Sequence, residues 1–273
     1  QQGYLRLVSM PVLPNDNFAD AIAIPNPEGS GFSTVTGRNR GANYEPGEPA
    51  YLNTANTVWW KWTANRTTAM LVTGSMEDTG SARYTLLWVY TGSSVDALTE
   101  VAFGNHSGGP FTGMASFQAT AGTTYFFRIS GGNNASGNIT LSLGQHPAAA
   151  WRQTYFGTAE GTGDAADTGD PDADGLANLL ECALGSSPTS AQSRASVLTS
   201  TAEINGEQRL SLEFTPAVTL GLRYYIEAST DLIDWTQQTE LTNLTAGQNK
   251  IHTDYENLGS TPRRFLRLRV SSE

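Results

Sequence analysis

Acidic side chains recur with a regular spacing in the middle of the chain, between residues 170 and 181. These twelve residues follow the pattern D-x-D-x-D-G-x5-E without a mismatch. In such a loop the first three carboxylates surround one side of a cation, the glycine allows a sharp turn, and the glutamate closes the shell. The predicted ligands, all oxygen donors, are Asp170, Asp172, Asp174, the backbone carbonyl of Leu176, Asn178 and Glu181. Ca²⁺ is the ion that this pattern predicts, since it takes six to eight oxygens.

A helix must follow the loop if Glu181 is to reach the ion. Apolar side chains at the i, i+3, i+4, i+7 and i+8 positions predict that helix, and Gly185 ends it. They are Leu176, Leu179, Leu180, Ala183 and Leu184. No helical period precedes Asp170, so we expect a single structural site rather than one of the paired sites of a calcium sensor.

The segment 146–193 differs from the rest of the chain in charge. Seven acids and no Lys or Arg lie between Gln153 and Ala191, in a chain whose net charge is −10. We expect cation binding here to neutralise this repulsion and to fix the angle between two flanking β-domains. Two alternatives remain open: the segment is a solvated acidic linker, or Asp164 and Asp167 extend the site or hold a second ion.

Composition excludes several classes of protein. With 38% hydrophobic residues in 273, the chain can bury a core, which argues against bulk disorder. No stretch approaches 18 consecutive apolar residues, so no membrane span is predicted. A pI near 4.8 argues against a nucleic-acid partner. The start at Gln1, the single Cys182 and the Thr- and Asn-rich composition favour an extracellular protein whose signal peptide has been removed.

The rest of the chain has the pattern of short strands, so the predicted fold class is all-β. Segments 56–64, 84–90, 124–129 and 138–143 are rich in β-branched and aromatic residues and are separated by turn signals. They predict a jelly-roll-like β-sandwich over 15–145. Strand patterns after residue 194, such as 264–270, predict a smaller, immunoglobulin-like β-sandwich over 194–273, joined to the first by the linker 146–193.

Residues 1–14 stand apart as a possible donor strand. Apolar side chains lie on both faces of the implied strand, with Leu5 and Leu7 on one face and Tyr4, Val8 and Met10 on the other. A strand with two apolar faces requires cover on both. It could add to the open edge of its own sandwich or to that of a neighbouring subunit, and the second case would give a filament.

Three parts of the chain resemble secreted modules of Verrucomicrobia and Planctomycetes that are similar to the bacterial pre-peptidase C-terminal domain. The matching segments are 15–21, 57–62, 89–92 and 121–125 in the first module, 170–181 in the linker, and 225–229 and 265–268 in the last module. The resemblance implies an extracellular multi-module β-protein and leaves its function open. Acids that the family often carries are replaced here by Tyr84, Asn105 and His106, so we expect a metal in the linker only.

Few other residues indicate chemistry. No nucleophile elbow, zinc-binding helix or phosphate loop is present, and the three histidines are expected to be isolated surface residues. Cys182 is expected to be a small packing residue. Trp59 lies on the opposite strand face from Trp60, and an exposed Trp59 could form an aromatic platform for sugars.

The sequence therefore predicts a non-enzymatic, calcium-stabilised structural protein of the cell surface. A more specific version of this prediction is that the chain is a filament subunit that assembles through the N-terminal strand. The alternative is a carbohydrate- or matrix-binding adhesion module of a secreted hydrolase, for which the resemblance is the only support. The expected partners are accordingly other copies of the chain, or an extracellular matrix or polysaccharide.

Overall fold

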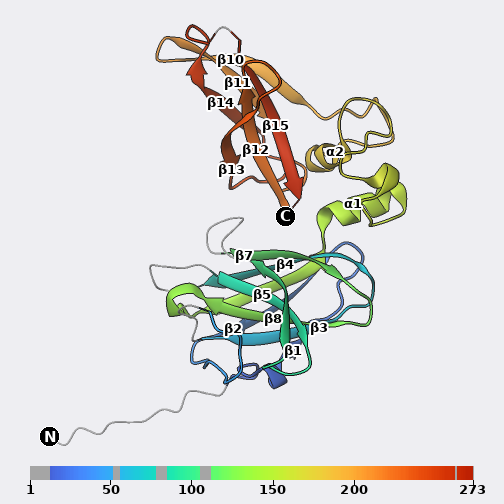
Figure 1. The fold of residues 1–273 in the computed structure, drawn as a ribbon, viewed down its shortest axis with the longest axis vertical. Helices are drawn as coiled ribbons and strands as arrows, with labels where there is room; N and C mark the ends of the chain where they lie inside the picture. Colours follow the sequence, from blue (N-terminus) through green and yellow to red (C-terminus); the bar gives the residue numbers. More distant parts are fainter. Residues whose placement is uncertain (1–12, 52–55, 78–84, 105–111, 262, 273) are drawn as a thin grey trace, which may run out of the picture. The chain divides into compact units, whose positions relative to one another are not determined.

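The computed structural model describes residues 13–51, 56–77, 85–104, 112–261 and 263–272. They form two compact units, Gln1–Gln145 and His146–Glu273, each containing two β-sheets (Figure 1). The prediction of an all-β chain is confirmed, because strands dominate both units. The jelly-roll and immunoglobulin-like assignments stay predictions. The acidic segment 146–193 belongs to the second unit.

The first unit contains one sheet of five strands and one of four. The five-stranded sheet has the order β1-β3-β8-β5-β6, with β1 Ile22–Ala23, β3 Val58–Thr63, β8 Thr124–Gly131, β5 Thr85–Gly92 and β6 Leu98–Gly104. The four-stranded sheet has the order β2-β9-β4-β7, with β2 Phe32–Arg38, β9 Asn138–Gln145, β4 Thr68–Glu77 and β7 Thr112–Ala119. All pairings in the four-stranded sheet are antiparallel, whereas β1 runs parallel to β3.

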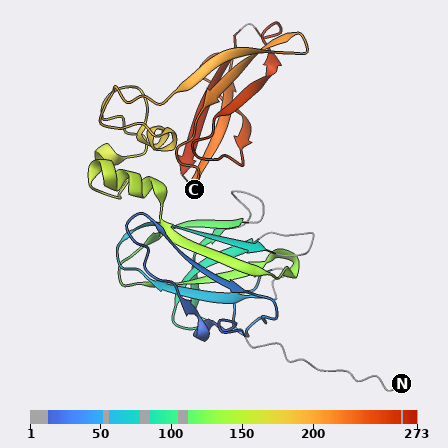
Figure 2. The same cartoon turned by 180° about the vertical axis from the view of Figure 1, so that it is seen from behind.

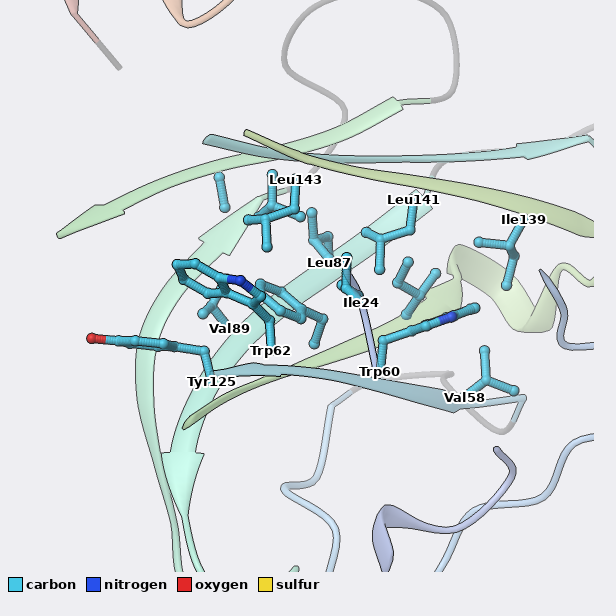
Figure 3. Close-up of a cluster of buried hydrophobic side chains, with 14 of the residues drawn as sticks. Ile24, Val58, Trp60, Trp62, Leu87, Val89, Tyr125, Ile139, Leu141 and Leu143 are labelled. Atoms are coloured by element: carbon cyan, nitrogen blue, oxygen red, sulfur yellow. The ribbon is translucent and has the colours of Figure 1, made fainter. Parts of the chain in front are cut away.

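Side chains of both sheets meet in one core, as Figure 3 shows. From the five-stranded sheet, Trp60 and Trp62 point inward, and from the four-stranded sheet Leu141 and Leu143 do so. All four side chains are buried. The alternation of the sequence around Trp60 thus correctly predicted which face of β3 contributes to the core. Gly37 on β2 is required for close packing, because a Cβ there would lie 2.7 Å from the Trp60 ring.

The outer face of the five-stranded sheet carries a second buried cluster, which contains Trp59, Trp88 and Tyr90. Phe18 covers it from the short 3-10 helix η1 (Phe18–Asp20), with its ring centroid 5.3 Å from that of Trp59. Trp59 is 0% exposed. The suggestion that Trp59 forms an exposed aromatic platform is therefore wrong: both faces of β3 are covered, one by the opposite sheet and the other by this cluster.

A buried ion pair lies beside this cluster. The Arg128 guanidinium is 3.2 Å from the Glu48 carboxylate, and both side chains are fully buried. Glu48 also accepts hydrogen bonds from the hydroxyl of Thr57 at 2.8 Å and from the indole of Trp59 at 3.1 Å. Burial raises the pKa of Glu48, and the charge of Arg128 opposes this rise. The pair fixes the loop before β3 onto the sheet, because Arg128 donates to the carbonyl of Pro49 as well.

The second unit begins with two helices and continues with two three-stranded sheets. Its helices are α1 (Pro147–Phe156) and α2 (Asn178–Leu184), which are in contact (Figure 2). One sheet has the order β10-β11-β14, with β10 Val197–Ile204, β11 Glu207–Phe214 and β14 Lys250–Asn257. The other has the order β13-β12-β15, with β13 Thr236–Leu241, β12 Leu222–Ser229 and β15 Phe265–Ser272.

Helix α2 is part of the core of the second unit. Ala183 lies in the same buried cluster as Leu212 and Phe214 of β11 and Tyr224 of β12. The Tyr224 hydroxyl donates to the carbonyl of Ala183 at 3.0 Å. The helix that follows the acidic loop is therefore attached to both sheets of this unit.

Helix α1 was not predicted from the sequence. His146 caps it by accepting the amide hydrogen of Ala148 at 3.2 Å, and Pro147 occupies its first position. The other ring nitrogen of His146 lies 3.1 Å from the carbonyl of Gly221. Burial lowers the pKa of His146. The expectation of isolated surface histidines is wrong for His146 and His252, which are 3% and 9% exposed, because each packs inside the second unit.

Candidate metal centre

The acidic loop is shaped by its own carboxylates. Asp170 accepts the amide hydrogens of Asp174 at 3.2 Å and Gly175 at 3.0 Å, and Asp174 accepts that of Leu176 at 2.8 Å. Gly175 has φ +92°, a left-handed conformation that glycine adopts without strain. Gly175 thus makes the sharp turn that the sequence pattern predicts. Local hydrogen bonds hold the loop in a fixed shape.

Three predicted ligands converge. One carboxylate oxygen from each of Asp170, Asp172 and Asp174 lies within 4.8 Å of the others. Such a group could hold a metal ion, because three negative charges at this separation repel one another without a counter-charge. Within the described part of the chain, Arg194 is the cation at ion-pair distance, with its Nε 3.8 Å from Asp174.

Several oxygens in the loop and in the first turn of α2 are buried without a hydrogen-bond partner. Within the described residues, four side-chain oxygens at this place are buried and have no hydrogen-bond partner. They are Asp172 Oδ2, Asp174 Oδ2, Asn178 Oδ1 and Glu181 Oε2. Buried polar atoms in folded proteins are nearly always paired with protein, water or an ion. The donor set is composed of oxygen alone, which fits a hard divalent cation.

Asn178 is oriented by the segment upstream of the loop. Its Nδ2 donates to the carbonyl of Asp164 at 2.8 Å and to that of Ala166 at 2.7 Å. Both amide hydrogens are thus used on carbonyls, so the orientation of the amide is fixed and Oδ1 is the atom left for a ligand. Asp164 contributes a carbonyl to this support, whereas the carboxylate of Asp167 pairs with Arg152.

Glu181 lies in the first turn of α2 and is fully buried. Ser186 donates to its Oε1 at 3.1 Å, and Oε2 has no partner. Burial, and then the charges of Asp172 and Asp174, raise the pKa of Glu181 to about 7. A buried carboxyl with this pKa is only partly ionised near neutral pH, and a cation placed next to it would favour the anion.

Several supporting residues were not predicted. Arg152, on α1, is mostly buried and donates to the carbonyl of Ala159 at 3.3 Å in addition to pairing with Asp167. Arg152 is the last basic residue before the stretch that lacks Lys and Arg, and Arg194 is the first one after it. These two positions were the only indication of their role in the sequence. The hydroxyl of Ser186 had no signal, because its contact with Glu181 depends on the left-handed turn at Gly185, with φ +82°.

Cation binding is expected to release a proton from Glu181. With a pKa of about 7, Glu181 is largely protonated at pH 6 in the metal-free protein, so binding there should release about one proton. The apparent affinity should consequently fall by up to about tenfold per pH unit below 7. Calorimetric titration in two buffers of different ionisation enthalpy measures the released proton, and E181Q should abolish it.

The same shift predicts how the metal-free protein responds to pH. The folded pKa of Glu181 lies above its usual value of 4.5. The stability that its protonated form contributes is therefore complete below pH 4.5 and is lost as the pH rises through 7. A bound cation should remove this loss, so a pH series of melting curves with and without the cation should diverge as the pH rises. If the difference in melting temperature with and without the cation stays the same at every pH, the raised pKa of Glu181 is contradicted.

Other sequence-predicted site residues are placed differently. Tyr4, Leu5, Leu7, Val8 and Met10 lie outside the described residues, as do Tyr84, Asn105 and His106. Cys182 is buried, as expected of a packing residue, and burial raises the pKa of its thiol to about 12. Among the described residues, no helix is both long and apolar enough to cross a membrane.

Comparison with known proteins assigns no family. No protein-family model matches the chain. No curated protein sequence is significantly similar to it either.

Solved structures give weak likenesses. The pre-peptidase C-terminal domain of a collagenase from Bacillus anthracis is 14% identical with a TM-score of 0.29, over 45% of this chain and 91% of that domain. A mitogen from Yersinia pseudotuberculosis is 12% identical with a TM-score of 0.28, over 43% of this chain and 87% of that one. A GH2 beta-galacturonidase from Eisenbergiella tayi, bound to galacturonate, is 8% identical with a TM-score of 0.21, over 82% of this chain and 36% of the enzyme. TM-scores this low establish neither a shared fold nor a shared function.

Proposed function

We propose that the loop 170–181 binds one Ca²⁺ and that the chain is an exported, non-enzymatic structural protein whose second unit is stabilised by this ion. The observation that carries the proposal is the convergence of three carboxylates together with four buried oxygens that have no hydrogen-bond partner, two of which belong to Asp172 and Asp174 themselves. Asp170, Asp172, Asp174, Asn178, Glu181 and the carbonyl of Leu176 would hold the ion. Calcium supplies no reaction chemistry here; it neutralises the carboxylates and joins the loop to α2.

Calcium is favoured over magnesium by the nature of the ligands. Mg²⁺ requires near-ideal octahedral geometry and usually keeps several waters, whereas Ca²⁺ accepts a flexible shell of protein oxygens. The partner-free oxygens of Asp174 and Glu181 are buried, so a strongly hydrated ion would have to give up its waters. A site of this kind, filled in an extracellular medium, would remain occupied without acting as a switch.

A structural role follows from the position of α2. Glu181 lies two residues before Ala183, whose side chain is in the core and whose carbonyl accepts the hydroxyl of Tyr224. The ion would therefore fix the helix that fills one end of this core. The effect on the angle between the two units stays a prediction.

The absence of enzymatic activity is part of the proposal. His146 uses one ring nitrogen to cap α1 and has the carbonyl of Gly221 within hydrogen-bond distance of the other. The thiol of Cys182 is buried, and its raised pKa makes it a poor nucleophile. The alternative of a carbohydrate-binding module loses the contact residue that was named for it, since Trp59 is buried.

Calorimetry tests the proposal directly. Protein treated with a chelator and then titrated with CaCl₂ should show one site, and MgCl₂ should bind much more weakly. D174N should remove the calcium site, whereas the control D234N, in an exposed turn of the same unit, should leave it unchanged. Equal calcium binding by wild type and D174N would contradict the proposal.

A further inference from the structure

The two sides of the first unit where the sheets end differ, because only one of them is closed by backbone. On one side β6 and β7, the edge strands of the two sheets, approach each other closely. A Cβ at Gly104 would lie 2.0 Å from the carbonyl oxygen of Met114, and one at Gly113 would lie 3.2 Å from that of Gly104. Backbone therefore closes this side of the unit, and no further strand can enter between β6 and β7.

The other side is bounded by β1 and β2. Strand β1 has only two residues, whereas β2 has seven and pairs with β9 without a register shift. Among the described residues no strand pairs with the second edge of β2. Natural proteins usually protect such an edge with proline, lysine, a bulge or an inward charge. Strand β2, with the sequence FSTVTGR, has none of these, and its one charged residue, Arg38, is exposed at its carboxyl end.

The inward side chains of β2 are incompletely covered. Val35 packs against the core but is only half-buried, unlike its pairing partner Leu141, which is fully buried. A hollow of about 490 Å³ lies at the end of this strand. Its lining includes Leu13, Ile22, Gly37, Arg38 and Ile139. The open edge offers free main-chain hydrogen-bonding groups, and Leu13, Ile22 and Ile139 supply apolar surface among the polar residues that also line the hollow.

We propose that residues 4–10 of a second copy of this chain bind antiparallel along the free edge of β2, with apolar side chains over Val35 and in the hollow. The inference rests on the proposed structural role and names its partner. Main-chain hydrogen bonds to β2 would supply affinity, and the alternate apolar side chains would supply specificity. Because donor and acceptor surfaces differ, the contact is head-to-tail and repeats into a filament unless a ring closes.

A second copy is favoured over the chain's own segment by strand direction. Leu13 lines the hollow beside Gly37 and Arg38, at the carboxyl end of β2. Residues 4–10 of the same chain would therefore run along β2 in the same direction as β2, and the two would form a parallel pair. Every pairing in this sheet is antiparallel, and antiparallel pairing is slightly the more stable per residue. A second copy is free to bind in the antiparallel direction.

Disulfide trapping between two different full-length variants tests the proposal. One variant carries L7C and the other, with an added affinity tag, carries T36C on β2. Mixing them under mild oxidation should give a tagged–untagged covalent dimer, because a disulfide between these positions can then only be intermolecular. The native Cys182 is buried and serves in the wild-type mixture as the background control.

Two further variants distinguish specific strand binding from nonspecific association. V35K places a charge on the inward face of the open edge and should lower the yield of trapped dimer at least tenfold. V101K places the same charge on β6, where Val101 is 38% exposed, and should leave the yield unchanged. Melting curves of both variants establish that each is folded.

The outcomes are decisive for this inference. A disulfide that forms only within a single chain carrying both L7C and T36C would show that the segment binds its own β2 and would overturn the proposal. Absence of any disulfide between the two positions would overturn it as well. Calcium titration of the same samples reports on the metal centre separately, so failure of the strand contact and failure of the calcium proposal are distinguishable.

Discussion

Chelating calcium is expected to lower the unfolding free energy of the second unit by about 4 kcal/mol, relative to protein in calcium at a thousandfold excess over its dissociation constant. The physical reason is that the carboxylates of Asp170, Asp172 and Asp174 then repel one another, with the largely exposed Arg194 as the cation at ion-pair distance, and the buried Oε2 of Glu181 accepts no hydrogen bond. For a unit of this size the melting temperature should fall by roughly 15 °C. Differential scanning calorimetry, which resolves the transitions of two units, measures the change.

The first unit provides the internal control for this experiment, because none of the predicted ligands lies before residue 146. Its transition should keep its temperature in chelator and in calcium. D174N should melt in calcium as the wild type does in chelator, and D234N should melt as the wild type does in calcium. A second unit whose melting temperature is the same with and without chelator would exclude a structural ion.

Replacing Glu48 with alanine is expected to destabilise the first unit by about 3–5 kcal/mol. E48A leaves the guanidinium of Arg128 fully buried without its carboxylate and removes the acceptor for Thr57 and Trp59. Most of the cost arises because the buried charge of Arg128 has lost its counter-charge, rather than from loss of a favourable attraction. Urea unfolding followed by tryptophan fluorescence measures the change.

A matched substitution and a double variant sharpen this test. E100A removes an exposed acid from β6 and should change the free energy of unfolding by less than about 0.5 kcal/mol. E48L combined with R128M removes both charges and should be less destabilised than E48A alone, since no buried charge remains. If the double variant is the least stable, the pair contributes net attraction, and the stated reason is wrong.

How far the sequence predicted the fold depended on how much each strand buries. Strands with one or two buried faces, such as β3 and β5, have a clear apolar pattern and were predicted. Four strands were missed, namely β1, β2, β10 and β13, and none of them contains a fully buried side chain. Each lies at an edge of its sheet, and its sequence lacks the apolar period that reveals a strand, whereas the edge strand β7 buries most of its side chains and was predicted. Helix α1 lacks a clear apolar stripe because the side chains that it buries are Ala148, Ala149 and Arg152.

The candidate metal centre was largely predictable because its proposed ligands are close in sequence. A loop of twelve residues brings its own carboxylates together, so spacing alone predicted the cluster of Asp170, Asp172 and Asp174. The groups that orient these ligands come from further away and depend on tertiary packing. The buried pair of Glu48 and Arg128 is the extreme case, since 80 positions separate two residues that no local pattern connects.

Helix α2 has only seven residues, too few to be stable alone in water. With the proposed ion bound, its position would depend on that ion at one end and on the packing of Ala183 and the hydroxyl of Tyr224 at the other. Maturation of the second unit would therefore follow the calcium content of its surroundings. In a chain that is still inside a calcium-poor cell, the second unit would be loosely packed and accessible to proteases. It would pack tightly once the chain reaches a calcium-rich medium.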